Sequence, residues 1–170
     1  MKTLRLAGVI RESIVDGPGI RLVVFAQGCP HHCPGCHNPD THDPQGGYDS
    51  DPDDLLKVVR QNPILQGVTF SGGEPFLQAE GFARLGREIH QLGLSVVTYT
   101  GYTMERLLDG LRDNPGWESL LRETDTLVDG PFLLTEKSML LPFRGSRNQR
   151  VLDPQASLLA GKPVEKEFTL

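Results

Sequence analysis

The sequence predicts an α/β fold, an open βα barrel formed by a single domain over residues 1–170. Short apolar, β-branched runs alternate along the chain with amphipathic segments, which is typical of a parallel sheet with helical crossovers. Several of these runs end in glycine-rich or polar turns, where the chemistry of such sheets gathers. A complete eight-stranded barrel takes roughly 250 residues. A chain of 170 residues therefore predicts a partial barrel.

The first predicted elements surround a cysteine-rich loop. Residues 21–27 read R-L-V-V-F-A-Q, an apolar run that predicts a buried strand ending at Gly28. The loop at residues 28–39 follows directly, and its prolines and glycines allow the chain to curl. Residues 51–60 then predict a helix with an acidic N-cap and a proline in its first turn.

The remaining elements alternate between strand and helix. Residues 68–70 predict a short strand that leads into the turn S-G-G-E-P at residues 71–75. Apolar residues then recur at helical intervals until Gly93 ends the pattern. Four further elements follow: a strand over residues 94–100, helices over residues 104–111 and 117–122, and a strand over residues 126–128 that ends at Asp129.

Composition argues against two classes of partner. The net charge is −5 and the pI is near 5.5, which lacks the basic footprint of a nucleic-acid-binding protein. No run approaches the roughly 18 apolar residues of a membrane span, and the first residues lack the apolar segment of a signal peptide. We therefore expect neither nucleic acid nor membrane as a partner, and a cytoplasmic location.

The three cysteines are the most informative residues of the chain. Cys29, Cys33 and Cys36 form the spacing C-x-x-x-C-x-x-C, which supplies three thiolates and no fourth. An odd, clustered set argues against disulfides and for metal ligation in a reducing compartment. Structural zinc sites use four ligands, whereas an iron–sulfur cluster held by three thiolates keeps one iron open.

Three histidines near these cysteines leave a mixed zinc site as an alternative, because imidazole is a common zinc ligand. They are His31, His32 and His37. We expect His31 and His32 to be exposed loop residues that screen the cluster.

Motifs on both sides of the cysteines carry a resemblance to a known family. They are S-I-V-D-G-P-G-I-R-L-V-V-F-A-Q-G at residues 13–28, C-H-N-P-D-T at residues 36–41 and S-G-G-E-P at residues 71–75. Together they resemble the radical S-adenosylmethionine (SAM) activases of glycyl-radical enzymes. Three later strings are similar to the activases that serve anaerobic ribonucleoside-triphosphate reductase: T-Y-T-G-Y at residues 98–102, V-D-G-P-F at residues 128–132 and R-G-S-R-N-Q-R at residues 144–150.

The resemblance implies a radical SAM barrel, two cofactors and an oxidoreductase reaction. Cys29, Cys33 and Cys36 would hold one [4Fe-4S] cluster, whose open iron would chelate the methionine part of SAM. A reduced flavodoxin- or ferredoxin-type donor would supply one electron, and SAM would split into methionine and a 5′-deoxyadenosyl radical. The radical would take hydrogen from a glycine Cα of the large subunit of anaerobic ribonucleotide reductase.

The resemblance also implies a set of SAM-binding residues. Ser71, Gly72 and Gly73 would offer backbone polar groups at close range, and Glu74 would add negative charge near the bound ammonium. Gly35, Cys36 and His37 would meet the adenosine, Gly35 because it stands where many relatives have an aromatic residue.

Several residues keep two interpretations. Asp129 suits a ribose hydroxyl, or it caps a helix or turn beside Gly130. Either Thr98 or Tyr99 contacts a ligand, or both pack within the sheet. The arginines of residues 144–150 suit carboxylate recognition or the partner surface, or they form a solvated basic loop.

Two alternative functions remain at the level of the sequence. The nearer is activation of pyruvate formate-lyase or another glycyl-radical enzyme. The more remote is a non-catalytic metal-binding or electron-transfer module, although a simple redox carrier needs four closed ligands and no glycine-rich nucleotide rim.

Overall fold

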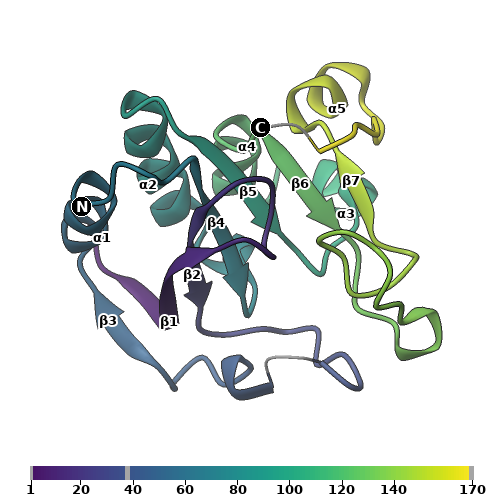
Figure 1. The fold of residues 1–170 in the computed structure, drawn as a ribbon. Helices are drawn as coiled ribbons and strands as arrows, with labels where there is room; N and C mark the ends of the chain where they lie inside the picture. Colours follow the sequence, from purple (N-terminus) through teal and green to yellow (C-terminus); the bar gives the residue numbers. More distant parts are fainter. Residues whose placement is uncertain (1, 37–38, 169–170) are drawn as a thin grey trace.

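The computed structural model of the chain describes residues 2–36 and 39–168. Within them, seven strands form one sheet in the order β3-β1-β2-β4-β5-β6-β7 (Figure 1). The strands are β1 (Leu4–Ser13), β2 (Arg21–Ala26), β3 (Tyr48–Ser50), β4 (Gly67–Gly72), β5 (Ser95–Tyr99), β6 (Thr126–Asp129) and β7 (Arg150–Leu152).

The centre of the sheet is parallel and its edges are antiparallel. Strands β2, β4, β5 and β6 run side by side in the same direction, as the alternating pattern predicts. Strands β1, β3 and β7 are antiparallel to their neighbours and extend the predicted parallel sheet at its edges. Strands β3 and β7 end the order without pairing to each other, and the expected open barrel is confirmed.

The carboxyl ends of the parallel strands lie level with one another. Ala26 at the end of β2 pairs with Gly72 of β4, and Tyr99 at the end of β5 pairs with Val128 of β6. Since loops that follow these ends share one edge of the sheet, the cysteine loop and the S-G-G-E-P turn start as neighbours.

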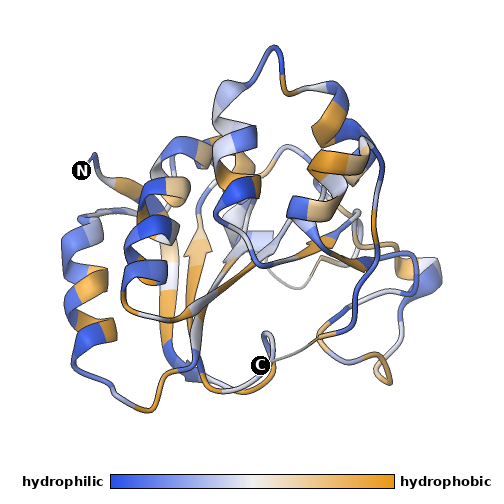
Figure 2. Ribbon diagram, turned by 90° about the horizontal axis from the view of Figure 1, so that it is seen from above, coloured by the Kyte–Doolittle hydropathy of each residue, from blue (hydrophilic) through white to orange (hydrophobic). Residues whose placement is uncertain are grey.

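Helices cover one face of the sheet (Figure 2). They are α1 (Pro52–Arg60), α2 (Ala79–Gln91), α3 (Met104–Asp109), α4 (Pro115–Arg122) and α5 (Pro154–Ala160). Short 3-10 helices lie at Pro39–Thr41, Pro75–Gln78 and Leu134–Glu136. Proline and aspartate begin α1 as expected: the Asp51 side chain accepts a hydrogen bond from the backbone N–H of Asp53.

The main core lies between the helices and this face. Leu22 and Val24 of β2 join Phe70 of β4 and Val96 of β5, and all four are fully buried. The helical side chains Phe82, Leu85 and Ile89 of α2 pack on them, as their spacing predicts. Burying each such side chain contributes roughly 1.5–3 kcal/mol, so this layer fixes the sheet on which the site is built.

The opposite face carries a buried arginine instead of a helix. Arg21 is 1% exposed, and it donates hydrogen bonds to Thr69 Oγ1 at 2.9 Å and to the Pro18 carbonyl at 3.0 Å. Burial lowers the pKa of Arg21 to about 10. These bonds attach the loop that precedes β2 to the open face of the sheet.

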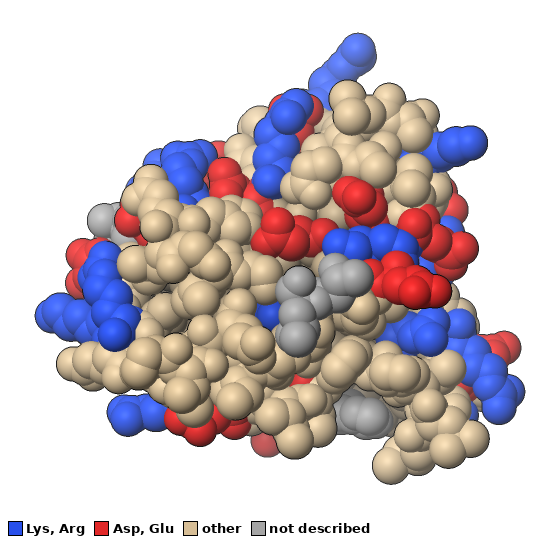
Figure 3. Space-filling view, turned by 45° about the horizontal axis from the view of Figure 1, so that its top comes forward, with Lys and Arg blue, Asp and Glu red and all other residues tan. Residues whose placement is uncertain are grey.

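Charge on the surface agrees with the composition. On the face shown in Figure 3, Lys and Arg side chains are interspersed with Asp and Glu side chains. Among the described residues, no helix is long and apolar enough to span a membrane.

Candidate functional site

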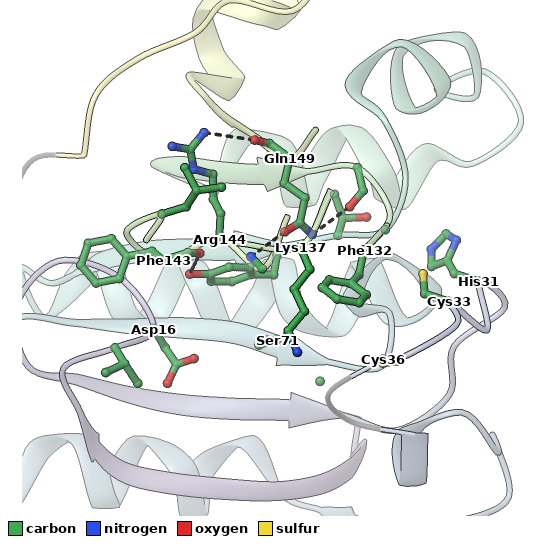
Figure 4. Close-up of a pocket in the computed structure, with 18 of the residues that line it drawn as sticks. Asp16, His31, Cys33, Cys36, Ser71, Phe132, Lys137, Phe143, Arg144 and Gln149 are labelled. Atoms are coloured by element: carbon green, nitrogen blue, oxygen red, sulfur yellow. Dashed lines mark hydrogen bonds between the residues drawn. The ribbon is translucent and has the colours of Figure 1, made fainter. Parts of the chain in front are cut away.

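A cavity of about 660 Å³ opens at the carboxyl ends of the parallel strands (Figure 4). All three cysteines line it together with most of the predicted SAM turn: Cys29, Cys33, Cys36, Ser71, Gly72 and Gly73. Its size lies within the roughly 300–1,000 Å³ of small-molecule sites. The fold therefore brings residues more than thirty positions apart in the sequence to one wall.

Strand β2 delivers the cysteine loop through backbone hydrogen bonds. The N–H of Gly28 donates to the Thr41 carbonyl at 2.7 Å, and the N–H of Cys29 donates to the His42 carbonyl at 3.1 Å. Gly28 has a φ of 101°, which explains the glycine at this sharp exit from the strand. The three thiols are partly exposed and none forms a disulfide.

Two opposing influences act on the Cys29 thiol. Burial raises its pKa, while backbone N–H groups of His31 and His32 hydrogen bond to the sulfur and act in the opposite direction. The charge of Glu74 raises the pKa further, and the net shift is upward. Since a metal ligand must be the thiolate, the two N–H donors favour the form that binds.

The donor set fits an iron–sulfur cluster. Three soft thiols in one cavity are the ligands that such clusters use, and a cluster distributes them over different irons. Among the described residues, no three His, Cys, Asp or Glu side chains are grouped as they would be around a single ion. His37, the third histidine of the zinc alternative and a predicted adenosine contact, lies outside the described residues.

The S-G-G-E-P turn is hydrogen bonded to the cysteine loop. The N–H of Gly73 donates to the Ala26 carbonyl at 2.8 Å, and the N–H of Glu74 donates to the Gly28 carbonyl at 2.7 Å. A Cβ on Gly73 would collide with that same Gly28 carbonyl. A glycine is required here by the neighbouring loop, whatever the turn binds.

Glu74 lies behind the cavity wall and not in it. Its carboxylate is fully buried and accepts hydrogen bonds from the Thr100 hydroxyl and from the backbone N–H groups of Phe76 and Gly101. His31 Nε2 lies 2.6 Å from Glu74 Oε1. The His31 side chain is 15% exposed, so the expectation of an exposed His31 is wrong, whereas His32 is exposed as expected.

Asp129 also lies behind the wall, at the end of β6. It accepts a hydrogen bond from the N–H of Met104 at 2.8 Å, so it holds the first turn of α3. Its two oxygens also bind Arg150, and Arg150 in turn contacts Glu105. The hydrogen bonds of that arginine raise its pKa. The helix-capping alternative therefore describes the observed contacts of Asp129.

Of the remaining predicted residues, Thr98 and Tyr99 lie on opposite faces of β5, and Gly35 lies in the cysteine loop. Thr98 faces the helices and bonds Thr124 at 2.9 Å. Tyr99 lines the cavity, and its hydroxyl donates to the Phe143 carbonyl at 2.7 Å. Gly35 has a φ of 72° and does not line the cavity, and a Cβ there would meet Leu134 Cδ1 at 3.0 Å.

The loop of residues 130–149 closes the far side of the cavity and holds residues that sequence reasoning missed. Figure 4 shows the Lys137 side chain extending into the cavity beside Phe132. The sequence offered one signal, a single lysine within the otherwise uncharged run that follows Glu136. Long-range packing, which sequence spacing does not report, decides where that lysine points.

The string R-G-S-R-N-Q-R folds back on itself at the cavity edge. Gln149 Oε1 accepts hydrogen bonds from the N–H groups of Gly145 and Ser146 at 2.8 and 3.1 Å. Arg144 lines the cavity and donates to the Gln149 carbonyl at 3.2 Å, and its buried Nε has no hydrogen-bond partner among the described residues. The string thus forms part of the cavity wall through Arg144, Gly145 and Gln149, while the side chain of Arg147 is exposed.

Comparison with known proteins gives a family match over most of the chain. The family described as "4Fe-4S single cluster domain" matches residues 15–152, which include the three cysteines, the S-G-G-E-P turn and the string T-Y-T-G-Y. The solved structure of QueE from Escherichia coli is a partial likeness, with a TM-score of 0.48 and 20% identity over 59% of this chain and 54% of that one.

Curated relatives fall into two groups. The anaerobic ribonucleoside-triphosphate reductase-activating proteins of Salmonella typhi and Vibrio cholerae are 32% and 34% identical to this chain. These matches cover 81% and 80% of this chain, and 91% and 89% of the relatives. The pyruvate formate-lyase-activating enzyme of Clostridium pasteurianum is 48% identical over 73% of this chain. The chain spans about half, 50%, of the length of that relative.

Proposed function

The chain belongs to the 4Fe-4S activating proteins of glycyl-radical enzymes, and from that premise we propose that it activates an anaerobic ribonucleoside-triphosphate reductase. The observation that carries the proposal is the shared cavity wall: three thiols and the backbone of Ser71, Gly72 and Gly73 face the same space.

The residues of this wall have separate tasks. Cys29, Cys33 and Cys36 would hold the [4Fe-4S] cluster as thiolates. Backbone groups of residues 71–73 would receive the ammonium of SAM, because glycine allows close approach. Lys137, whose side chain enters the cavity, would place a positive charge for the carboxylate of SAM.

When bound, the cluster and SAM would supply the one-electron chemistry needed to remove a hydrogen atom from a glycine Cα of the partner. The chain contributes placement and exclusion of water. Phe132 and Tyr99 form apolar parts of the wall, which limit the access of solvent to a reactive radical.

A protein substrate is supported by the mouth of the cavity. Ile14, Val15 and Met139 line the cavity, and each is more than half exposed, at 73%, 69% and 86%. Exposed apolar side chains around one opening are typical of a surface that another macromolecule covers.

One string of the sequence favours the reductase over the lyase as the partner. R-G-S-R-N-Q-R at residues 144–150 resembles the reductase-activating proteins, and it forms part of the cavity wall through Arg144, Gly145 and Gln149. The higher identity of 48% to the lyase-activating enzyme favours the lyase as the second candidate. Both candidates use the same radical chemistry.

The supply of electrons and the compartment follow from the same chemistry. A reduced flavodoxin- or ferredoxin-type protein would deliver the electron to the cluster. Partly exposed thiols that serve as ligands require a reducing compartment, and we place the protein in the cytoplasm, acting as one unit over residues 1–170.

Anaerobic reconstitution tests the chemistry. The wild-type chain should bind one [4Fe-4S] cluster and, with a reductant, convert SAM to methionine and 5′-deoxyadenosine. Cys29→Ala, Cys33→Ala and Cys36→Ala should each lose both the cluster and SAM cleavage, because the chain has no fourth cysteine to substitute. Full iron content and SAM cleavage in any of these variants would remove that cysteine from the ligand set.

A further inference from the structure

We propose that His31 is a positioning residue that joins the cysteine loop to the S-G-G-E-P turn, so that the cluster loop and the SAM turn hold their geometry together. The proposal rests on the proposed function, since it assigns these two segments to the cluster and to SAM. His31 also lines the cavity, and its positioning role rests on the contact of its imidazole with Glu74 behind the wall.

The imidazole of His31 makes a short contact across the site. Its Nε2 lies 2.6 Å from Oε1 of Glu74, which is 43 residues away in the sequence. The Glu74 side chain is 0% exposed and that of His31 is 15% exposed. Because a carboxylate oxygen accepts and does not donate, Nε2 carries the hydrogen and the bond is charge-assisted.

The two carboxylate oxygens of Glu74 accept hydrogen bonds from three segments: the cysteine loop, the residues after its own turn and residues 100–101. Oε1 accepts from the N–H of Gly101 at 2.8 Å, and Oε2 accepts from the N–H of Phe76 at 3.1 Å. The Thr100 hydroxyl donates to both oxygens, at 2.8 and 2.9 Å. A buried carboxylate needs all its donors, so removal of the His31 donor leaves Oε1 less well satisfied in a place that water barely reaches.

The backbone of His31 reaches the ligand sulfur. Its backbone N–H hydrogen bonds to the Cys29 sulfur. One residue therefore contacts a cluster ligand with its main chain and the SAM turn with its side chain.

The imidazole ring of His31 is closely packed by Tyr102 and Gly101. Its ring packs edge-on against Tyr102, with ring centroids 4.5 Å apart. A Cβ on Gly101 would collide with the ring, so the glycine of T-Y-T-G-Y makes room for it. These contacts with Tyr102 and Gly101 fix the direction of the hydrogen bond to Glu74. They also join the T-Y-T-G-Y string at residues 98–102 to the cysteine loop and the S-G-G-E-P turn.

His32 provides a matched control beside it. It belongs to the same spacer between Cys29 and Cys33, but its side chain is exposed and its ring packs on His42 with centroids 4.9 Å apart. Leucine at either position removes only the imidazole, keeps a similar bulk and leaves the backbone N–H near the Cys29 sulfur in place. Glutamine at position 31 can place its side-chain NH2 near the position of Nε2 and donate a hydrogen bond to Glu74.

The experiment compares wild type with His31→Leu, His31→Gln and His32→Leu. Two properties of the reconstituted proteins are measured: the rate at which an iron chelator removes the cluster, and the dissociation constant for SAM. The chain without a cluster is measured by amide hydrogen exchange of the cysteine loop, which requires no cofactor. Circular dichroism confirms that each variant is folded.

His31→Leu should change all three properties together. We expect about tenfold faster cluster loss and about tenfold weaker SAM binding, the factor that one hydrogen bond to a charged group represents, with faster amide exchange in the cofactor-free chain. His31→Gln should recover most of the loss, and His32→Leu should match wild type. In a Glu74→Gln background, His31→Leu should have little further effect.

Wild-type cluster retention, SAM binding and amide exchange in His31→Leu would overturn the proposal. Equal effects of His31→Leu and His32→Leu would also overturn it, because they would point to the spacer in general. These measurements do not depend on activation of the reductase, so they still test the role of His31 if the chain fails to activate it. If the wild-type chain binds no cluster, amide hydrogen exchange of the cofactor-free chain still tests that role.

Discussion

Arg150 and Asp129 are joined by two hydrogen bonds at the end of β6, one from Nε at 3.1 Å and one from Nη2 at 2.6 Å. The same guanidinium bonds Glu105 of α3 at 2.6 Å, and this bond lowers the pKa of Glu105. Arg150 therefore ties the cavity loop to the sheet and to a helix. Its guanidinium thus binds two carboxylates of the chain itself.

Replacement of Arg150 by methionine should destabilise the folded chain. Asp129 is 1% exposed on its side chain, so the variant leaves a buried carboxylate without its cation. Loss of such a charged hydrogen-bonded partner costs about 2–3 kcal/mol. Urea unfolding of the cofactor-free chain measures it. Arg147→Met, at an exposed position of the same loop, should be within about 0.5 kcal/mol of wild type.

Gly73→Ala should impair the cluster and SAM binding together. The added Cβ would collide with the Gly28 carbonyl directly before Cys29, so the cysteine loop must move. Overpacking of this kind costs about 1–3 kcal/mol. Iron content and SAM affinity of reconstituted protein provide the measurement. Gly8→Ala, where a Cβ would have nothing within 4 Å, is the control and should retain both properties. Normal iron content with weak SAM binding in Gly73→Ala would contradict the shared packing of the two turns.

Lys137→Met should weaken SAM binding without loss of the cluster. The lysine side chain enters the cavity from the loop that faces the cysteines, but it is no ligand of iron. Removal of a cation that contacts a carboxylate predicts about a tenfold higher dissociation constant. Lys162→Met, on an exposed segment after α5, removes the same charge away from the cavity and should bind SAM normally. Unchanged SAM affinity in Lys137→Met would exclude the lysine from the SAM site.

The stability of the folded chain should depend on pH through His90 of α2. Its nitrogens lie 2.9 Å from Glu123 and 2.7 Å from Asp125. Burial lowers the pKa of His90, but the hydrogen bonds to these carboxylates outweigh burial and raise it overall.

Because the folded pKa lies above the unfolded value of about 6.5, these ion pairs stabilise the fold below that pH and lose their effect as pH rises through the folded pKa. The melting temperature of the cofactor-free chain should therefore fall more in His90→Gln at pH 6 than at pH 9. Equal losses at both pH values would mean that His90 contributes by packing alone.

The central strands and helices could be predicted because their signals are local. The apolar run of residues 21–27 and the helical spacing of Phe82, Leu85 and Ile89 each report burial directly. Strand β1 could not be predicted in the same way, since its ten residues alternate irregularly and carry arginine and glutamate. Strand β7 and helix α5 follow a loop whose path depends on contacts with β6.

The sequence predicted the parts of the site where metal ligation dictates the residue type. It predicted less well the parts where packing decides the direction of a side chain. The thiols of Cys29, Cys33 and Cys36 line the cavity as their spacing and the S-G-G-E-P turn suggest. Glu74 and Asp129 have the expected chemistry, but hydrogen-bond partners more than twenty residues away turn both carboxylates behind the wall. Sequence spacing cannot report such partners.

The measurement that tests the central claim most directly is paramagnetic resonance of this protein mixed with a glycyl-radical enzyme. Each mixture contains reduced, cluster-loaded protein and SAM, with either anaerobic ribonucleotide reductase or pyruvate formate-lyase as the second protein. We expect the doublet of a glycyl radical with the reductase, none with the lyase, and none with Cys33→Ala. A doublet with the lyase alone would contradict the assigned partner, and its absence from both mixtures, although SAM is cleaved, would contradict the activating function itself.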